Sequence, residues 1–171
     1  MVENRRVLIV DDERTIHKVL QRILAPALKT DVLSQGAALF GETSDQPDKM
    51  TDDRFELTFA DCGPDGIEAV KAAMIRKQPF ALAFIDLGMP GMNGVEAARQ
   101  IWEVDPNIKI VFATGSVYLD TENICRVTGR NDFFHLQKPF GIKTVLTLAR
   151  TLAQQWADAR KSERTLSHGR Q

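Results

Sequence analysis

The polar residues with the clearest chemical potential each follow a short run of apolar residues. They are Asp11, Asp12, Asp86, Thr114 and Lys138. Carboxylates brought close together repel one another, which raises the pKa of at least one of them unless a cation neutralises the cluster. Oxygen ligands with open positions beside them suit Mg²⁺, which keeps several waters and accepts phosphate oxygens as further ligands. If these side chains meet in the fold, the sequence predicts a magnesium site.

A hydroxyl and an ammonium group beside such a metal site would bind an incoming phosphoryl group. Thr114 would donate a hydrogen bond, and Lys138 would act as a compact positive charge. A carboxylate at the centre can serve as the nucleophile and form an aspartyl-phosphate. Asp86 is the central carboxylate by strand order. The predicted chemistry is metal-assisted phosphoryl transfer onto the protein itself.

The elements that must position these residues are visible as alternating patterns. Continuous apolar runs are typical of strands buried on both faces, and apolar residues at helical spacing indicate amphipathic helices. The expected strands are 7–10, 55–59, 80–85, 108–113 and 133–137, and the expected helices are 15–25, 64–77, 95–104, 119–127 and one from Ile142. This alternation predicts an α/β fold, a parallel sheet with helices on both faces. Because ligands bind at the carboxyl ends of such strands, the five polar residues converge on one edge.

Composition limits the class of protein. The 171 residues are 43% hydrophobic and 26% charged, which suits one globular domain with a core of its own. The 22 Lys and Arg nearly balance 23 Asp and Glu, for a net charge of −1, which gives no bulk attraction to nucleic acid or to an anionic membrane. The two cysteines, Cys62 and Cys125, lack metal-ligand spacing and favour a reduced, cytoplasmic setting. The N-terminal apolar run of four residues is too short for a signal peptide or a membrane span.

Four separated motifs resemble the receiver domain of bacterial two-component response regulators. They are VLIVDDE at 7–13, FIDLGMPGMNG at 84–94, Thr114 within VFATGS, and KPF at 138–140. The resemblance covers about residues 5–150 with one interruption. It implies a flavodoxin-like, doubly wound five-stranded parallel sheet of order 2-1-3-4-5. The interruption, residues 26–54, resembles insertions in N-terminal receivers of multidomain signalling proteins.

The resemblance also implies roles for individual residues. Asp86 is expected to accept a phosphoryl group from a histidine kinase or a histidine phosphotransfer protein. The side chains of Asp11, Asp12 and Asp86 and the backbone carbonyl of Gly88 are expected to bind Mg²⁺. Thr114 and Lys138 are expected to contact the phosphate.

Phosphorylation is then expected to act as a switch. Thr114 would move inward, and the surface of helix 119–127, strand 133–137 and the terminal helix would repack to control a downstream effector domain or protein. The same surface, or the terminal helix, is where a homodimer would form. The Lys138–Pro139 bond is expected to be cis. Such a chain is a phosphoacceptor that catalyses its own phosphoryl transfer and autodephosphorylation, and it is not an enzyme in the usual sense.

Three positions depart from the family pattern. Gly88, two residues after the acceptor, leaves an open route for an attacking water. His135 stands where the family has Tyr or Phe; it either alters the switch and makes it sensitive to pH, or is a half-exposed edge-strand histidine. Segment 26–54 is either a tolerated surface insertion or a partner-docking element, with a short helix followed by an exposed loop.

Two other functions use the same residues. A haloacid dehalogenase-type Mg²⁺ phosphatase also has an aspartate nucleophile, but it needs a second aspartate where this chain has Gly88, and its motif order is inverted. A receiver-like interaction module that is never phosphorylated usually loses Asp86, the acidic pair or Lys138, and all of them are present.

The remaining expectations concern the helices. His17 is expected at the surface, and Trp156 is expected to be the last core anchor of the terminal helix. Residues 1–150 form the predicted receiver domain. Residues 151–171 are expected to hold the end of the terminal helix and a polar tail or linker.

Overall fold

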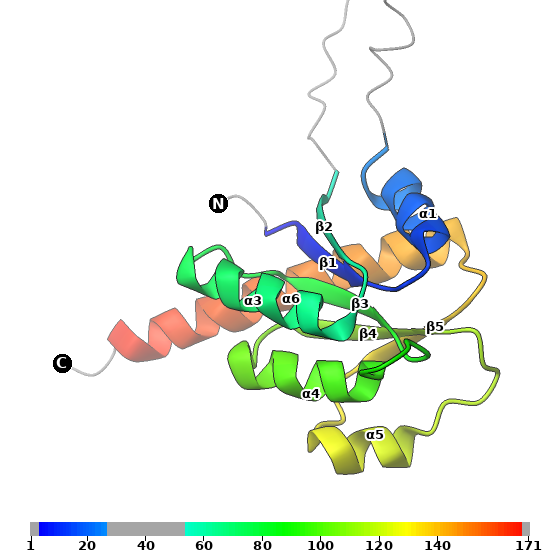
Figure 1. Ribbon diagram of the computed structural model, residues 1–171. Helices are drawn as coiled ribbons and strands as arrows, with labels where there is room; N and C mark the ends of the chain where they lie inside the picture. The colour runs from blue at the N-terminus through cyan, green and yellow to red at the C-terminus, as the bar shows by residue number, and fades with distance from the viewer. Residues whose placement is uncertain (1–3, 27–53, 169–171) are drawn as a thin grey trace, which may run out of the picture.

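A parallel five-stranded sheet forms the centre of the computed structural model, which describes residues 4–26 and 54–168. Its strands are β1 (Arg6–Val10), β2 (Glu56–Ala60), β3 (Leu82–Asp86), β4 (Lys109–Thr114) and β5 (Phe134–Gln137). They pair in the order β2-β1-β3-β4-β5, and every pair is parallel. The predicted α/β class and the order 2-1-3-4-5 are confirmed (Figure 1).

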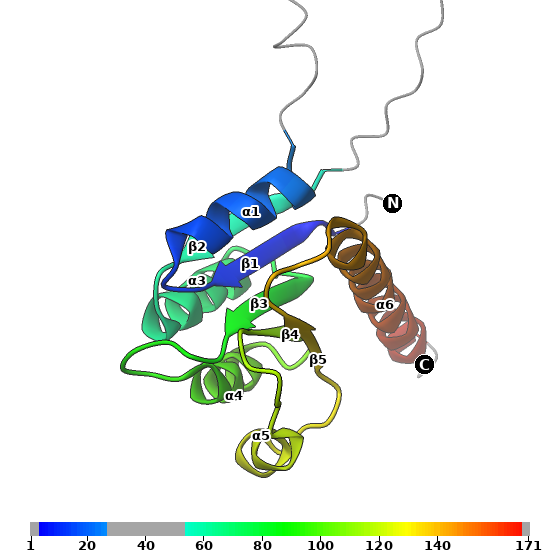
Figure 2. The same ribbon diagram turned by 90° about the vertical axis from the view of Figure 1, so that its right-hand side faces the viewer.

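Helices cover both faces of the sheet. They are α1 (Arg14–Leu24), α3 (Gly63–Ile75), α4 (Gly94–Val104), α5 (Thr121–Thr128) and α6 (Ile142–His168). α1 and α6 lie on one face and α3 and α4 on the other, with α5 beside α4 (Figure 2). Successive β1 residues belong to different cores: Leu8 and Val10 pack on the α3 and α4 side, and Val7 and Ile9 on the α1 and α6 side. This burial on both faces explains why the run is wholly apolar.

The chain on the two sides of segment 27–53 comes together at the edge of the sheet. The backbone N–H of Phe55 donates to the carbonyl of Leu24 at 2.9 Å, and the N–H of Glu56 donates to Arg5 at the same distance. β2 therefore pairs with β1 as it would after a short connection. The helix and the loop predicted within 26–54 lie outside the described residues.

The prediction that His17 lies at the surface is wrong. His17 is only 9% exposed, and its ring stacks on Phe59 with 5.0 Å between centroids. The buried face of α1 runs through His17, Leu20 and Leu24, while Ile16 and Val19 are only partly buried. The imidazole of His17 therefore faces the core at a point of the helix where the apolar pattern predicted Ile16 and Val19 instead.

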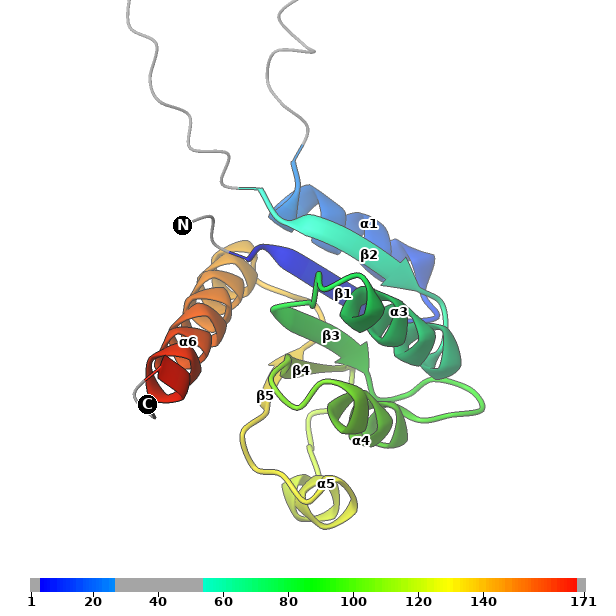
Figure 3. The same cartoon turned by 90° about the vertical axis from the view of Figure 1, so that its left-hand side faces the viewer.

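α6 continues through the segment expected to be a polar tail. It spans 27 residues without a break, and its second half extends past the strands in Figure 1. Figure 3 looks at the molecule from the side on which this half of the helix ends. Trp156 is 8% exposed and packs in the core, as expected of an anchor. The division of the chain at residue 150 stays a prediction, since the helix crosses it. No helix within the described part of the chain is long and apolar enough to cross a membrane.

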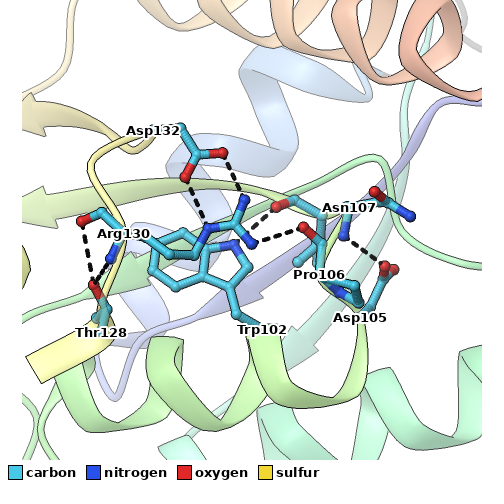
Figure 4. A network of polar contacts seen from close by, with 8 residues as sticks. Trp102, Asp105, Pro106, Asn107, Thr128, Arg130 and Asp132 are labelled. Carbon is cyan, nitrogen blue, oxygen red and sulfur yellow. Dashed lines mark hydrogen bonds and ion pairs between the residues drawn. The ribbon is translucent and has the colours of Figure 1, made fainter.

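Arg130 fastens the connection between α5 and β5 to the end of α4 (Figure 4). Its guanidinium lies 4.8 Å from the centre of the Trp102 ring, donates to the carbonyl of Pro106 at 2.9 Å, and pairs with both oxygens of Asp132 at 2.6 and 2.8 Å. The hydrogen bond from Arg130 lowers the pKa of the Asp132 carboxyl. The Trp102 indole in turn donates to the Ile108 carbonyl at 3.1 Å, so a loop, a helix end and the start of β4 are joined.

Replacing Arg130 by methionine is expected to lower the free energy of unfolding by about 1 kcal/mol at neutral pH, because a cation–π contact and partly exposed polar contacts are lost. The carboxyl of Asp132 has its pKa lowered on folding, so its contribution is present above its ordinary value of 3.8 and is lost as the pH falls. Urea unfolding at pH 7 and pH 3 measures both effects. Arg126→Met is the control, since Arg126 is exposed and its guanidinium donates to the side chain of Asn123 on its own helix; an equal loss in both variants would contradict the prediction.

Candidate functional site

Three carboxylates meet at the carboxyl edge of the sheet. Asp11 and Asp12 follow β1, and Asp86 is the last residue of β3, the neighbouring strand. One oxygen from each of them lies within 4.8 Å of the other two. Asp11 is 1% exposed and Asp86 is 8% exposed, whereas Asp12 is open to solvent. The structure therefore brings together the three carboxylates that the sequence predicted to meet at the strand ends.

Lys138 lies between the two buried carboxylates. Its Nζ is 2.7 Å from Oδ2 of Asp11 and 3.0 Å from Oδ1 of Asp86. Burial of the ammonium lowers the pKa of Lys138, but the hydrogen bonds to Asp11 and Asp86 and their charges outweigh this effect and raise it above its ordinary value. The lysine neutralises part of the acidic cluster and fixes one oxygen of each buried carboxylate.

Backbone N–H groups hold the other oxygen of each buried carboxylate. The N–H of Glu13 donates to Oδ1 of Asp11 at 2.8 Å, and the N–H of Gly88 donates to Oδ2 of Asp86 at 3.1 Å. Both are bonds from a residue two positions further along the chain, a local turn that aspartate favours. The orientation of both carboxylates is thus set before any ligand binds.

Thr114 ends β4 beside the acidic cluster. Its side chain is buried, and its Oγ1 accepts a hydrogen bond from the N–H of Ser116 at 3.0 Å. Its backbone carbonyl accepts from the N–H of Lys138 at 2.8 Å, which ties the hydroxyl and the lysine to the same edge. The hydrogen bond from Ser116 connects the Thr114 hydroxyl to the segment 115–120.

An open cavity of about 780 Å³ adjoins Asp86. Asp86, Gly88 and Thr114 line it on the sheet side, and residues of α4, α5 and segment 115–120 line it on the other. Gly88 faces this space, and a Cβ added there would have only Oδ2 of Asp86 within 4 Å, at 3.7 Å. A phosphoryl group on Asp86 has room to be accommodated here.

His135 and Pro139 lie near the site without joining the acidic cluster. His135 is exposed on the edge strand β5 and pairs with Phe112, two positions before Thr114 in the register. This exposure agrees with the interpretation of His135 as an edge-strand residue, and a switching role for it stays a prediction. The Lys138–Pro139 peptide bond is cis.

Sequence reasoning missed two features of the site. The cavity between α4 and α5 depends on where α5 sits, and no local pattern encodes that position. Asn93 caps α4 by accepting from the N–H of Glu96 at 3.0 Å, which fixes the end of the loop after Asp86. The signal for this cap was present, because asparagine directly before a helical pattern is a common N-cap.

The donor set fits a hard divalent cation. All three side chains offer carboxylate oxygens, and the exposure of Asp12 leaves the cluster open on the solvent side. Mg²⁺ prefers such a site, because it keeps several of its own waters. The side chains of Asp11, Asp12 and Asp86 are the groups that would hold the ion.

Comparison with known proteins identifies the family. The fold and the site define an α/β domain with a buried acidic cluster and a lysine at the carboxyl edge of its sheet. A family model described as the response regulator receiver domain matches residues 49–150. This match spans more than half of the chain, and the chain belongs to the receiver domain family. β1, with Asp11 and Asp12, lies before the matched region, although it is a central strand of the sheet.

Curated relatives agree with this assignment. The response regulator receiver protein CpdR of Brucella abortus (strain 2308) is 32% identical over 94 residues, which cover 54% of this chain and 71% of CpdR. The chemotaxis protein CheY of Thermotoga maritima is 30% identical over 138 residues, which cover 80% of this chain and 87% of CheY.

Solved structures show the same fold at lower identity. The adenylate cyclase structure from Rhodopirellula baltica matches with a TM-score of 0.67 and 23% identity, covering 96% of this chain and 98% of that one. A CheY-like receiver domain protein from Methanospirillum hungatei matches with a TM-score of 0.63 and 19% identity, covering 91% and 98%. Receiver domains are signalling modules, and this chain is one of them.

Asp12→Asn is expected to weaken Mg²⁺ binding at least about tenfold with little change in stability, because Asp12 is exposed and supplies charge to the cluster. Calorimetric titration with Mg²⁺ measures the affinity. Asp65→Asn, which removes an exposed acid on α3, should bind Mg²⁺ like the wild type. Equal affinities for all three proteins would show that Asp12 is no ligand.

Proposed function

We propose that this chain is a phosphorylation-dependent switch in which Asp86 accepts a phosphoryl group from a histidine kinase or a histidine phosphotransfer protein. The observation that carries the proposal is the position of Lys138, whose ammonium bridges the buried carboxylates of Asp11 and Asp86 beside an open cavity. Membership of the receiver family supports it. A carboxylate oriented by the N–H of Gly88 and facing solvent space is a suitable nucleophile.

In the transfer step, an oxygen of Asp86 attacks the phosphorus of the donor. A bond forms between this oxygen and phosphorus, and the bond from phosphorus to the imidazole nitrogen of the donor breaks. Mg²⁺ held by Asp11, Asp12, Asp86 and the backbone carbonyl of Gly88 would supply positive charge against the phosphoryl oxygens. Lys138 would exchange part of its pairing with Asp86 for a phosphoryl oxygen, and Thr114 would donate its hydroxyl hydrogen to another.

The switch follows from the way Thr114 is connected. Drawing its hydroxyl toward the phosphoryl group breaks the hydrogen bond that Oγ1 accepts from Ser116, so the segment 115–120 moves. α5 begins directly after this segment and buries only Ile124 among its own side chains, so a modest change suffices to reposition it. The surface of α5, β5 and α6 then carries the signal to an effector.

Acetyl phosphate with Mg²⁺ tests the proposal directly. Intact-protein mass spectrometry should show one added phosphoryl group on the wild type, none on Asp86→Asn, and none when Mg²⁺ is chelated. The matched control is Asp120→Asn, which replaces a nearby exposed acid that caps α5; this variant should be modified like the wild type. Modification of Asp86→Asn to the wild-type extent would exclude Asp86 as the acceptor.

A further inference from the structure

The C-terminal end of α5 is closed by several hydrogen bonds. The helix runs into Gly129, which adopts the left-handed conformation with a φ of 70° and donates its N–H to the Cys125 carbonyl at 2.8 Å. The hydroxyl of Thr128 donates to the carbonyl of Ile124 at 2.7 Å and accepts from the N–H of Arg130 at 3.2 Å. These bonds join the last turn of the helix to the connection that leads to β5.

The same connection is fastened to the body of the domain. The guanidinium of Arg130 lies over the ring of Trp102 on α4 and pairs with both carboxylate oxygens of Asp132 (Figure 4). The ring of Phe133, the next residue, meets the ring of Phe112 on β4 edge to face, with 5.5 Å between centroids. Contacts with α4 and β4 therefore fix this end of α5. We call the side chains of Arg130, Trp102 and Asp132 the α5 anchor.

The N-terminal end of α5 is held only by local bonds. In the segment before the helix, the N–H of Ser116 donates to the hydroxyl of Thr114, and the N–H of Tyr118 donates to the hydroxyl of Ser116 at 3.2 Å. Within the described part of the chain, no hydrogen bond or ion pair joins residues 116–123 to a residue outside 114–128. The two ends of this short helix are thus held to very different degrees.

We propose that α5 rotates about the α5 anchor when Asp86 is phosphorylated, so that its N-terminal end moves and its C-terminal end stays in place. This inference rests on the proposed function, in which Thr114 releases the segment before α5. The cavity of about 780 Å³ beside Asp86 lies next to the loosely held end, because Tyr118, Leu119 and Asn123 line it. The moving end therefore has room, and the anchor makes the motion a hinge.

A hinge at this end divides the signalling surface into a fixed part and a moving part. β5 begins at Phe134, directly after the anchored connection, so its parallel pairing with β4 is kept while α5 rotates. The moving part holds Val117 and Tyr118, whose side chains are 91% and 78% exposed. An effector that distinguishes the phosphorylated state is therefore expected to contact this apolar and aromatic end of α5, and not β5.

Hydrogen exchange on the ligand-free protein tests the anchor without phosphoryl chemistry. Arg130→Met is expected to speed exchange of amides 125–129 about tenfold and to leave amides 116–124 within about twofold of the wild type, because only the anchored end loses contacts. Arg126→Met, which removes an exposed cation of the same helix, should leave both segments within about twofold of the wild type. If Arg130→Met speeds exchange equally in both segments, or in neither, the anchor does not exist.

Spin-label distances measured with beryllofluoride and Mg²⁺ test the rotation. The labels are attached to Glu122→Cys or to Asn131→Cys, each paired with Lys71→Cys on α3, in a chain whose two natural cysteines are replaced by alanine. α5 has 8 residues and is about 12 Å long, so a rotation of about 15° moves its first turn by about 3 Å. Beryllofluoride should therefore change the distance from the Glu122→Cys label by about 3 Å and that from the Asn131→Cys label by less than about 1 Å.

Removing the anchor should abolish this difference. In Arg130→Met the two distances are expected to change by similar amounts, whereas Arg126→Met should keep the wild-type difference. Equal changes at both ends of the wild type, or an Arg130→Met variant that keeps the difference, would overturn the hinge. If beryllofluoride binds and neither distance changes, the rotation is wrong, while Asp86 stands as the phosphoryl acceptor. If no beryllofluoride binds, the proposed function and the rotation fail together, and hydrogen exchange still decides the anchor.

Discussion

Replacing Lys138 by methionine is expected to lower the free energy of unfolding by about 3 kcal/mol in the absence of Mg²⁺, because it removes the cation from a buried pair and leaves two desolvated carboxylates uncompensated. The lysine side chain is 15% exposed, and those of Asp11 and Asp86 are 2% and 10% exposed, so water compensates little. Mg²⁺ should restore part of the loss, since a bound cation replaces the missing charge. Urea unfolding with and without Mg²⁺ measures both quantities, and phosphorylation by acetyl phosphate should fall sharply.

The pH dependence of Lys138 gives an independent check. Its pKa is raised on folding, so the stability that it contributes is fully present below the ordinary value of 10.5 and is lost as the pH rises through the higher folded value. The wild type should therefore lose stability in this alkaline range more steeply than Lys138→Met. Lys143→Met removes an exposed lysine at the start of α6 and is the control. If Lys138 were only a surface charge, Lys138→Met and Lys143→Met would show the same dependence of stability on pH.

The sheet and its site were largely predictable because the relevant signals are local. A wholly apolar run such as Val7–Val10 indicates a strand buried on both faces, and a charged residue directly after it marks the carboxyl end. Parallel pairing then places Asp11, Asp86 and Lys138 at one edge, whatever the lengths of the connections. At this edge the N–H groups of Glu13 and Gly88 and the ammonium of Lys138 hydrogen-bond the buried carboxylates of Asp11 and Asp86.

What could not be predicted depends on contacts between distant segments. His17 is buried on the face of α1 that meets β2, where its ring lies 5.0 Å from that of Phe59, whereas the periodicity of α1 alone favoured Ile16 and Val19. Similarly, the apolar stripe of α6 does not continue after Trp156, and this pattern alone indicates that the helix gives way to a polar tail. Arg160 continues the packed stripe with a charged side chain, because its guanidinium lies over the Trp156 ring at 4.6 Å.

The backbone of Gly94 lies very close to the backbone of Asp86. A Cβ at this position would lie 2.1 Å from the carbonyl oxygen of Asp86 and 2.9 Å from both the carbonyl carbon of Asp86 and Cα of Leu87. The Gly94 N–H also donates to the carbonyl of Leu87 at 3.3 Å, which closes the loop between β3 and α4. Because the neighbours are backbone atoms, they cannot turn away as a flexible side chain would.

Gly94→Ala is therefore expected to lower the free energy of unfolding by about 3 kcal/mol, since α4 or the end of β3 must move to relieve the overlap. The same movement displaces Asp86 from Lys138, so the rate of modification by acetyl phosphate should fall at least about tenfold, as expected when reacting groups are misplaced by a fraction of an ångström. Gly115→Ala is the matched control: its added Cβ meets nothing within 4 Å, although the residue directly follows Thr114. Urea unfolding and phosphorylation kinetics on the two variants compare a close backbone approach with an open position on the same edge of the sheet. Wild-type behaviour of Gly94→Ala in both assays would mean that the contact with Asp86 relaxes freely, and that α4 does not hold the acceptor.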